Sequence, residues 1–345
     1  MMTRDISSEL SESADVISKI DPDEIRAAAD IITEAFRRGN QAIFMGNGGS
    51  SADAQHISAE LSGKYLFHRP ALPGVCLSNI APVTAVGNDY SYAEVFRRQI
   101  QAVCREGDAV VCYSTSGNSE NIILAAEEAR IRGAKIITFT GSGGKLKDMA
   151  DAAVVIPSRE TPRIQEAYLC ASHIMCGMIE EEMFCNRAVF IDRDDTIAKN
   201  VPYCSNPDDF HLFEGVPENI ARLNEAGFKV IIITNQSGIG RGYFSEDVLS
   251  SIHSKLLRLV EEKGGRIDGI YYCPHAPEDN CRCRKPGIGM GLRAVSEHSV
   301  NPFRSYMVGD SEADMEFGKN LGCKVFRVGN GKTFSDAVSF ILGDQ

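Results

Sequence analysis

The sequence lacks the features of a membrane protein or a secreted protein. No apolar run reaches the roughly 18 residues that a membrane-spanning helix needs. The opening residues, MMTRDISSELSES, contain none of the apolar core of a secretory signal. We therefore expect a soluble, cytoplasmic protein that does not bind a membrane.

An excess of basic residues is also missing. The 345 residues carry a formal net charge of −11, from 36 Lys and Arg against 47 Asp and Glu. Residues 1–185 hold 17 Lys and Arg against 25 Asp and Glu, and the remainder holds 19 against 22. Because neither half is basic, a nucleic-acid-binding surface is disfavoured.

A disulfide framework is not indicated either, although the chain has 11 cysteines. Such frameworks are typical of short secreted chains, whereas most of these cysteines stand singly in apolar stretches, which predicts reduced core residues. These single cysteines include Cys76, Cys104, Cys112, Cys170 and Cys176. The sequence also has no internal repeat, and its 43% hydrophobic and 24% charged residues are typical of a globular protein.

Short apolar runs alternate with helix-length segments along most of the chain. Two helical patterns come first, at 6–20 and 23–38. Strands are then predicted at 42–46, 74–78, 109–114, 135–140 and 152–157, followed by a long helix at about 162–184. A second alternation has strands at 188–192, 229–235, 269–274, 305–310 and 324–329. The pattern predicts an α/β fold with two doubly wound parallel-sheet domains, 1–185 and 186–345, joined by almost no linker.

Two loops of the first half carry glycines and hydroxyls between a strand and a helix. They read GNGGSSADAQH at 46–56 and STSGNSEN at 114–121. Free backbone N–H groups at the start of a helix favour phosphate, and no lysine follows in the order of a nucleotide P-loop. Ordinary turn and capping chemistry would explain one such loop equally well. Two loops at corresponding strand ends favour a site for a monophosphate.

Two pairs of side chains share helix faces near these loops. His56 and Glu60 are four residues apart, and Gln165 and His173 are eight apart, or about two turns. Each pair alone is more often an ordinary surface feature. Together with the loops, the motifs GNGGS, ADAQHISAELSGKY, GNDY, STSGNS and RIQEAYLCASH make residues 1–185 resemble the SIS-domain phosphoheptose isomerases.

This resemblance implies a flavodoxin-like SIS domain that isomerises a sugar phosphate. It implies a zinc ion held by four side chains, those of His56, Glu60, Gln165 and His173. Glu60 and His173 would be the base and acid that move a proton between adjacent carbons through an enediol. The implied substrate-binding residues are Asn47, Gly48, Gly49, Asn88, Asp89, Ser114, Thr115, Ser116, Ser119 and Gln165. The family also implies a homotetramer assembled through this domain.

The second half places carboxylates at the end of a predicted buried strand. In AVFIDRDDTI, Asp192 and Asp194 follow the apolar run directly. A carboxylate at that position can attack phosphorus, and a second one can protonate the leaving oxygen. Three further motifs follow in chain order: TNQSG, CRKP and VGDSEAD. This ordered set resembles the haloacid-dehalogenase (HAD) phosphatase superfamily, which implies a Rossmann-like HAD domain.

The HAD resemblance assigns a role to each motif. It implies that Asp192 is the nucleophile, that Asp194 is the acid and base, and that Asp195 stands where a glycine is typical. The implied phosphate-binding residues are Thr234, Asn235, Gln236, Ser237, Arg284 and Lys285. Mg²⁺, which prefers oxygen ligands, would be bound by Asp192, the backbone of Asp194, and Asp310, with Asp314 supporting it from further away.

Three thiols and one imidazole form a second group with metal-ligand spacing. Cys273, His275, Cys281 and Cys283 make up a set typical of a closed, structural zinc site, with chance spacing as the alternative. Within the superfamily, this insert resembles those of heptose-bisphosphate phosphatases and related histidinol-phosphate phosphatases. TNQSGIGRGYF and YYCPH match the heptose branch.

The two resemblances together imply a bifunctional enzyme of heptose biosynthesis that acts on small sugar phosphates. The first site would convert D-sedoheptulose 7-phosphate to D-glycero-D-manno-heptose 7-phosphate, and a separate kinase would add the 1-phosphate. The second site would remove the 7-phosphate of the 1,7-bisphosphate through an aspartyl-phosphate intermediate. Two alternatives stay open at this point. The first domain could be a non-catalytic module that binds a sugar phosphate or a protein partner, or the phosphatase could act on histidinol phosphate.

Overall fold

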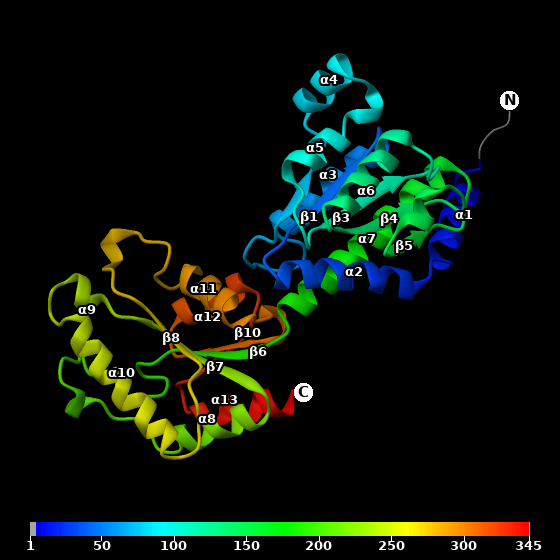
Figure 1. The fold of residues 1–345 in the computed structure, drawn as a ribbon. Coiled ribbons are helices and arrows are strands. Elements are labelled where there is room, and N and C mark those ends of the chain that lie inside the picture. The colour runs from blue at the N-terminus through cyan, green and yellow to red at the C-terminus, as the bar shows by residue number, and fades with distance from the viewer. Residues whose placement is uncertain (1–4, 345) are drawn as a thin grey trace. The chain divides into compact units, whose positions relative to one another are not determined.

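The structure, a computed structural model, describes residues 5–344 and divides into two compact units (Figure 1). The first unit holds residues up to Leu66 together with Ala71–Met183, and the second holds Phe67–Pro70 and the residues from Phe184 onward. Residues 1–4 and 345 of the expected domains lie outside the described residues. Within residues 5–344, no helix has the length and apolar character needed to cross a membrane.

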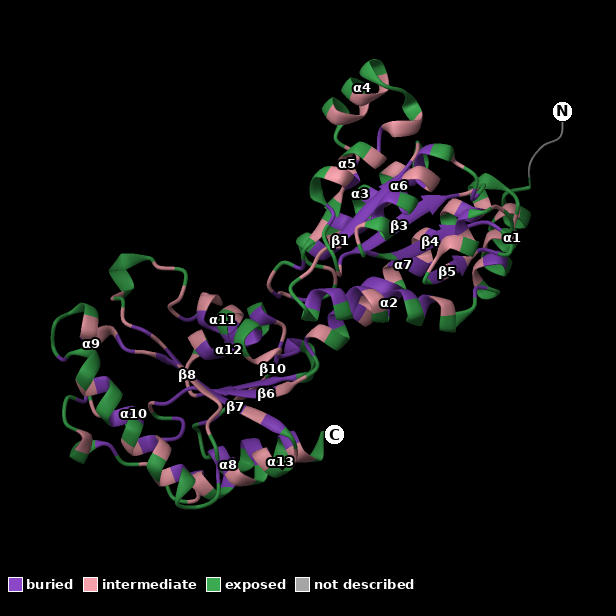
Figure 2. Ribbon diagram, in the orientation of Figure 1, coloured by how far each residue is buried: buried purple, intermediate pink, exposed green. Residues whose placement is uncertain are grey.

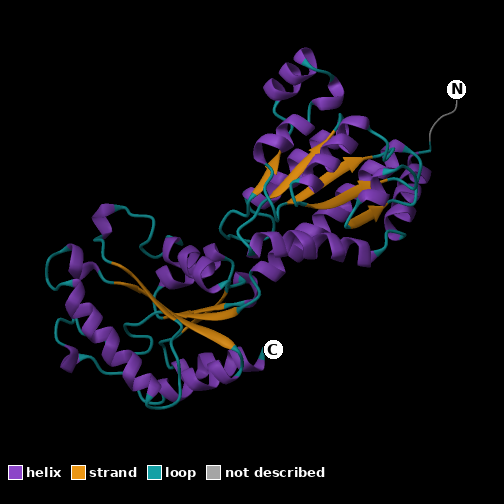
Figure 3. Ribbon diagram, in the orientation of Figure 1, coloured by secondary structure: helices purple, strands orange, loops and turns teal. Residues whose placement is uncertain are grey.

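A five-stranded parallel sheet forms the centre of the first unit (Figure 3). Its order, β2-β1-β3-β4-β5, is that of flavodoxin-like folds, which confirms the predicted fold class of this half. The strands are β1 (Ala42–Gly46), β2 (Gly74–Cys76), β3 (Ala109–Ser114), β4 (Lys135–Thr140) and β5 (Ala152–Val155). Ala42 lies between Gly74 and Ala109 in this register, so β1 sits inside the sheet.

Helices cover both faces of this sheet. They are α1 (Ile6–Ser18), α2 (Pro22–Arg37), α3 (Gly49–Ser62), α4 (Ile80–Asp89), α5 (Arg97–Val103), α6 (Glu120–Ile131) and α7 (Thr161–Met183), with 3-10 turns η1 (Tyr92–Glu94) and η2 (Leu146–Met149). α2 packs on α7 along one face, and α5 packs on α6 along the other (Figure 1). The Asp21 side chain caps the start of α2, where Pro22 needs no amide partner.

The inner strands of the first unit are buried because both faces of the sheet are covered (Figure 2). Every residue of β1 and β3 is buried. The core on the side of α5 and α6 includes Ile43, Met45, Val110, Ile122 and Ile136. The five single cysteines named above are all free, and three of them are buried.

The second unit also has a five-stranded parallel sheet, in the order β10-β9-β6-β7-β8. The strands are β6 (Arg187–Ile191), β7 (Phe228–Asn235), β8 (Gly269–Cys273), β9 (Tyr306–Gly309) and β10 (Lys324–Arg327). The helices are α8 (Val216–Glu225), α9 (Ser237–Gly240), α10 (Glu246–Glu261), α11 (Gly289–His298), α12 (Glu312–Leu321) and α13 (Phe334–Gly343). Three 3-10 turns, η3 (Pro207–Asp209), η4 (Pro277–Asp279) and η5 (Pro302–Arg304), complete it. The second predicted parallel-sheet domain is thereby confirmed.

The second sheet is also covered on both faces, and its central strands end at one edge. α8, α10 and α13 pack on one face around Ile220, Ile252 and Ala337, and α11 and α12 lie on the other (Figure 1). β6 lies between β9 and β7. Because all three strands are parallel, the residues that follow them meet at the same edge of the sheet.

A buried histidine on α10 leads to a prediction about pH. Burial, with a smaller contribution from Arg193, lowers the pKa of His253 from 6.5 to about 4, and its side chain is only 8% exposed. Below pH 6.5 the His253 imidazole therefore takes up a proton in the unfolded chain, whereas in the folded chain it stays neutral down to about pH 4. We expect a stabilisation of about 3 kcal/mol, present above pH 6.5, to be lost as the pH falls to 4. Denaturant unfolding at several pH values should show that His253→Gln loses less free energy of unfolding between pH 6.5 and 4 than the wild type does. Equal losses in the two proteins would contradict this.

Two candidate active sites

The two hydroxyl-rich loops of the first unit lie side by side because β1 and β3 are neighbouring parallel strands. The first loop turns at Gly48, whose φ of +55° favours glycine, and continues into α3. The second leaves β3 at Ser114 and enters α6 at Ser119, and these two hydroxyls are 3.1 Å apart. Asn47 and Asn121 join the loops through two reciprocal amide hydrogen bonds of 2.9 Å. The loops therefore form one polar surface at the carboxyl edge of the sheet.

A close approach of backbone to backbone shapes the second loop. At Gly117 a Cβ atom would lie 2.7 Å from the carbonyl oxygen of Gly143, and at Gly144 it would lie 2.5 Å from the Cα of Gly117. Both glycines also have left-handed φ angles, +64° and +94°. Glycine is therefore required at both positions, and the packed loop presents Thr115 and the exposed Ser116 at the surface.

His56, Glu60 and His173 form the centre of the first candidate site. The Nε2 atom of His56 lies 3.0 Å from Glu60 Oε1 and 3.4 Å from His173 Nε2. One ligand atom from each residue lies within 4.8 Å of the other two. Two imidazoles and one carboxylate are donors that zinc binds, and a catalytic zinc uses three protein ligands and an open position. The donor set therefore fits a catalytic zinc ion.

The Gln165 side chain lies over the first loop, and the segment that follows α4 is joined to the same loop. A Cβ atom on Gly49 would lie 2.5 Å from Gln165 Nε2, so the glutamine side chain occupies the space above that glycine. Asn88 and Asp89 are exposed and are joined to each other by a 2.8 Å hydrogen bond. Tyr92, which follows α4, donates a 2.9 Å hydrogen bond to Asn47 and so connects this segment with the first loop.

Two residues that support His173 are absent from the sequence prediction. The ring of Tyr65 stacks on the His173 imidazole, with centroids 5.7 Å apart and planes 8° apart. Glu180 is fully buried and accepts the backbone N–H groups of Tyr65, at 3.0 Å, and Leu66, at 2.9 Å. Glu180 stands seven residues, or two helical turns, after His173, and this spacing is the signal that could have identified it.

In the second unit, Asp192 and Lys285 form a buried ion pair at the end of β6. The Lys285 Nζ atom contacts Asp192 Oδ1, lies 2.6 Å from Asp314 Oδ1, and donates to the Ile233 carbonyl at 2.8 Å. Lys285 and Asp192 are 5% and 7% exposed. Burial raises the pKa of the Asp192 carboxyl, and Lys285 opposes that change. The lysine therefore holds the carboxylate in place and partly balances its charge.

The charge around Asp192 fits a divalent cation. Asp192, Asp310 and Asp314 each offer an oxygen within 4.8 Å of the other two. These three carboxylates face one lysine, so two negative charges remain unbalanced when all are ionised. An all-oxygen, doubly negative cluster has the chemistry that Mg²⁺ prefers. Asp194 is not in this cluster, which is consistent with an expected contribution from its backbone alone.

The Asp194 carboxylate is held apart from the cluster. Arg193 donates to both of its oxygens, at 3.0 and 2.9 Å, and Gln236 Nε2 donates to Oδ2 at 3.0 Å. Arg193 is only 2% exposed. The sequence prediction does not include Arg193, because nothing in its position between two aspartates shows that its side chain would be buried.

Asp195 occupies the position where the superfamily has a glycine, and its backbone adopts the conformation that explains that preference. Its φ is +56°, in the left-handed region that aspartate enters more readily than most residues. Its side chain accepts hydrogen bonds from the Asn200 backbone N–H at 3.2 Å and from Asn200 Nδ2 at 3.1 Å. These bonds stabilise the turn with a carboxylate in place of glycine.

The remaining phosphate-binding candidates follow β7 or adjoin Lys285. Thr234 is fully buried and accepts a 2.8 Å hydrogen bond from Gln236. The Asn235 side chain accepts the backbone N–H of Lys285 at 3.1 Å, which connects this loop to the lysine. Ser237 begins α9 and is half-buried. Within residues 5–344, no hydrogen bond or ion pair joins Arg284 to the carboxylates of the site. Arg284 donates instead to the His275 carbonyl at 3.4 Å.

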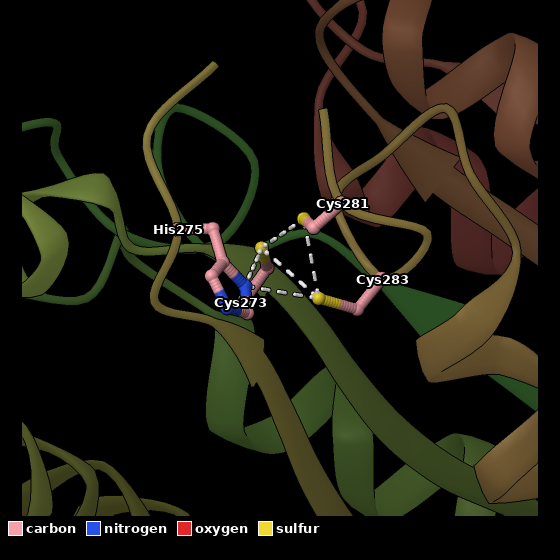
Figure 4. A group of neighbouring side chains, drawn as sticks. All are labelled: Cys273, His275, Cys281 and Cys283. Carbon is pink, nitrogen blue, oxygen red and sulfur yellow. Dashed lines mark hydrogen bonds between the residues drawn. The ribbon is translucent and has the colours of Figure 1, made fainter. Parts of the chain in front are cut away.

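The four predicted ligands of the zinc loop come together at the end of β8 (Figure 4). The three Sγ atoms of Cys273, Cys281 and Cys283 lie 3.4 to 3.5 Å apart, and His275 Nδ1 lies 3.3 Å from the last of them. Zinc–sulfur bonds of about 2.3 Å in a tetrahedron place the sulfur atoms about 3.8 Å apart. The four side chains are thus close to the arrangement that a structural zinc ion requires.

Comparisons with known proteins separate the two halves in the same way. A family model described as "SIS domain" matches residues 7–141, and one described as "Polynucleotide kinase 3 phosphatase" matches residues 187–334. The phosphoheptose isomerase of Rhodospirillum rubrum is 45% identical over 161 residues, which are 46% of this chain and 86% of that protein. The chain belongs to the phosphoheptose isomerase family through its first domain.

Further relatives of both halves are known. The phosphoheptose isomerase of Burkholderia pseudomallei is 40% identical over 186 residues, which are 52% of this chain and 94% of that protein. The solved phosphoheptose isomerase of Neisseria gonorrhoeae shares 35% identity, with a TM-score of 0.48 and coverage of 51% of this chain and 97% of that chain. The solved D,D-heptose 1,7-bisphosphate phosphatase of B. bronchiseptica, complexed with magnesium and phosphate, shares 30% identity, with a TM-score of 0.43 and coverage of 46% and 99%. The second domain thus matches a phosphatase family model over most of its length.

We expect the cluster of Cys273, His275, Cys281 and Cys283 to bind one zinc ion that stabilises the second domain. Cys283→Ser should lower the bound zinc by one equivalent and the unfolding temperature of the second domain by about 5–10 °C. Cys185→Ser, which replaces an exposed cysteine outside the cluster, is the matched control and should change neither value. Metal analysis and calorimetry measure both, and equal zinc contents in the two variants would rule out the site.

Proposed function

We propose that this chain is a bifunctional enzyme of heptose biosynthesis. Its first domain converts D-sedoheptulose 7-phosphate to D-glycero-D-manno-heptose 7-phosphate, and its second removes the 7-phosphate of D-glycero-D-manno-heptose 1,7-bisphosphate. The observation that carries the proposal is the convergence of His56, Glu60 and His173 beside the two hydroxyl-rich loops, in a domain of the phosphoheptose isomerase family.

The first site has the groups that a ketose-to-aldose conversion needs. The hydroxyls and N–H groups around Ser114 and Ser119 bind the sugar's phosphate. Glu60 removes a proton from C1 of the ketose while His173 protonates the C2 carbonyl oxygen, which gives the enediol. Glu60 then returns the proton to C2 while His173 takes the proton of the C1 hydroxyl, which gives the aldose. Zinc held by His56, Glu60, Gln165 and His173 would polarise that carbonyl. Tyr65 keeps the His173 ring in the orientation that the proton transfer requires.

The second site has the groups for phosphate transfer to a carboxylate. Asp192 attacks the phosphorus and forms an aspartyl-phosphate, while Asp194 protonates the leaving sugar oxygen. Asp194 then takes a proton from the water that hydrolyses the intermediate. Lys285 and Thr234 hold the phosphate oxygens. Mg²⁺ held by Asp192, Asp310 and the Asp194 backbone would reduce the repulsion between carboxylate and phosphate.

The substrate of the second site is proposed from its motifs and from the first domain. TNQSGIGRGYF and YYCPH match the heptose branch of the superfamily. An isomerase that makes a heptose 7-phosphate and a phosphatase that acts on a heptose 1,7-bisphosphate serve the same sequence of reactions. A separate kinase must add the 1-phosphate between them, so the first product leaves the chain before the second site acts.

We also propose that the chain assembles as a homotetramer through its first domain. α4 has no fully buried residue in the described chain: Val83 and Val86 pack partly against the core, while Ile80 and the following Tyr90 are 77% and 61% exposed. Apolar side chains gathered on an uncovered surface are typical of an interaction site. Light scattering coupled to size-exclusion chromatography should give four times the 37.6 kDa chain mass, and a monomer would contradict the proposal.

The test of the isomerase is incubation of the purified full-length protein with sedoheptulose 7-phosphate, with and without a zinc chelator, followed by NMR of the sugar. We expect the aldoheptose phosphate to appear and the chelator to stop its formation. No turnover by the zinc-supplied protein, with phosphatase activity intact, would show that the first domain is a non-catalytic module. Phosphate release from heptose bisphosphate and from histidinol phosphate, measured side by side, identifies the phosphatase substrate.

A further inference from the structure

Two exposed tyrosines of the second domain have no part in the chemistry described above. The ring centroids of Tyr203 and Tyr243 lie 4.5 Å apart, with the ring planes at 69° to each other. The side chains are 49% and 57% exposed, so this pair is not part of the core. A pair of aromatic rings left in water needs a reason, because burying such rings is strongly favourable.

A pocket next to these rings belongs to the phosphatase site. It has a volume of about 360 Å³, and the residues that line it include Asp194, Asn235, Gln236 and Tyr203. Asp194 is the proposed acid of this site, and Asn235 is tied to Lys285. A substrate whose phosphate is held by these groups extends through a pocket that Tyr203 borders.

The backbone at Tyr203 is held in a conformation that tyrosine rarely adopts. Its φ is +51°, and the turn around it is closed by a 3.0 Å hydrogen bond from the Cys204 N–H to the Val201 carbonyl. Pro202 and Tyr203 are the two central residues of this turn. When proline comes first and the second residue has a positive φ, that second residue is usually glycine. Cys204 is buried and anchors the turn. A strained, well-anchored residue beside an active site points to a functional role.

Tyr243 does not itself line the pocket, but its ring packs against that of Tyr203, and its backbone is equally well anchored. Its backbone N–H donates to the Gly238 carbonyl at 2.8 Å. The neighbouring Phe244 ring covers Gly238 so closely that a Cβ atom there would lie 2.2 Å from it. Gly238 and Phe244 both line the pocket. The two rings are thus fixed from two separate loops of the same site.

We propose that Tyr203 and Tyr243 form an aromatic rim that binds the sugar portion of the phosphatase substrate. The rim gives the site its preference for a polyhydroxylated sugar phosphate over a small phosphomonoester. Each ring offers an apolar face to the C–H groups of a sugar and a phenol that hydrogen-bonds with hydroxyls. This inference rests on the proposed function, because it concerns the substrate of the same site.

The test compares two substrates in variants of each tyrosine. In full-length Tyr203→Ala and Tyr243→Ala, we expect the KM for heptose 1,7-bisphosphate to rise about tenfold, the effect of losing one well-packed aromatic contact. The kcat/KM for p-nitrophenyl phosphate should stay within about twofold of wild type, because this small substrate does not need the sugar contacts. Phe340→Ala removes a 46% exposed ring that neither lines the pocket nor packs on the tyrosine pair, because its aromatic neighbours are Tyr306 and Phe326. It should change neither value.

Tyr203→Gly separates a binding role from a structural one. Glycine accepts a positive φ without strain, so this variant should unfold at the same temperature as wild type or higher, yet show the same rise in KM for the bisphosphate. An unchanged KM in the glycine and alanine variants would overturn the rim and leave the proposed function intact. Wild-type protein that hydrolyses p-nitrophenyl phosphate but not the bisphosphate would overturn both.

Discussion

Asp192→Asn is expected to lower phosphate release from heptose 1,7-bisphosphate by about four orders of magnitude or more. An amide cannot attack phosphorus in place of the carboxylate that lies against Lys285. The fold should persist, because Lys285 keeps its 2.6 Å contact with Asp314. The phosphate-release assay should therefore fail while the same preparation still isomerises sedoheptulose 7-phosphate at the wild-type rate.

The control for this prediction is Asp195→Asn. Asparagine also tolerates a left-handed φ, and its single amide oxygen can still accept the hydrogen bond from the Asn200 backbone N–H. We expect phosphatase activity within a few-fold of wild type in this variant. Substantial phosphate release by Asp192→Asn, with Asp195→Asn unaffected, would show that another group is the nucleophile.

His173→Ala is expected to reduce isomerisation by about three orders of magnitude and to leave phosphate release unchanged. The substitution removes a proposed acid and, at the same time, one donor of the group formed with His56 and Glu60. NMR of the sugar product measures the first activity, and phosphate release measures the second. Added zinc should not restore the isomerase, because the missing imidazole is itself one of the metal's ligands.

Ile174→Ala is the matched control for the histidine. Ile174 follows His173 on α7 and is 51% exposed, so its removal changes the same helix without touching the site. We expect nearly full isomerase activity. If His173→Ala retained activity comparable with that of the control, His173 would have no role in turnover, and other groups of the first domain would carry out the isomerisation.

The interior strands are predictable from sequence, and the edge strands only in part. The runs at 42–46, 109–114 and 135–140 coincide with β1, β3 and β4, because strands covered on both faces must be continuously apolar. The runs at 74–78 and 324–329 extend past the ends of β2 and β10. Each edge strand pairs with a single neighbour, so its length is set by that pairing.

Helix periodicity and family motifs identify some residues of the candidate sites from the sequence and miss others. A four-residue spacing places His56 and Glu60 on one face of α3, but only the fold brings His173 from α7 to within 3.4 Å of His56. Arg193 is outside both kinds of signal, and Glu180 has only its two-turn spacing from His173 to indicate it. Their carboxylate and amide partners are set by tertiary packing, and a charged residue in sequence gives no sign that it will be buried.

The contact between Gly117 of the second hydroxyl-rich loop and Gly144, which follows β4, has a consequence for how this domain can evolve. Gly117 and Gly144 meet through main-chain atoms, so enlarging one cannot be balanced by shrinking the other. A substitution at either position therefore has no compensating partner, unlike an exchange of large and small side chains in a core. Substitutions that repack the helices around the sheet can accumulate in small steps, whereas both glycines of this contact must be kept together.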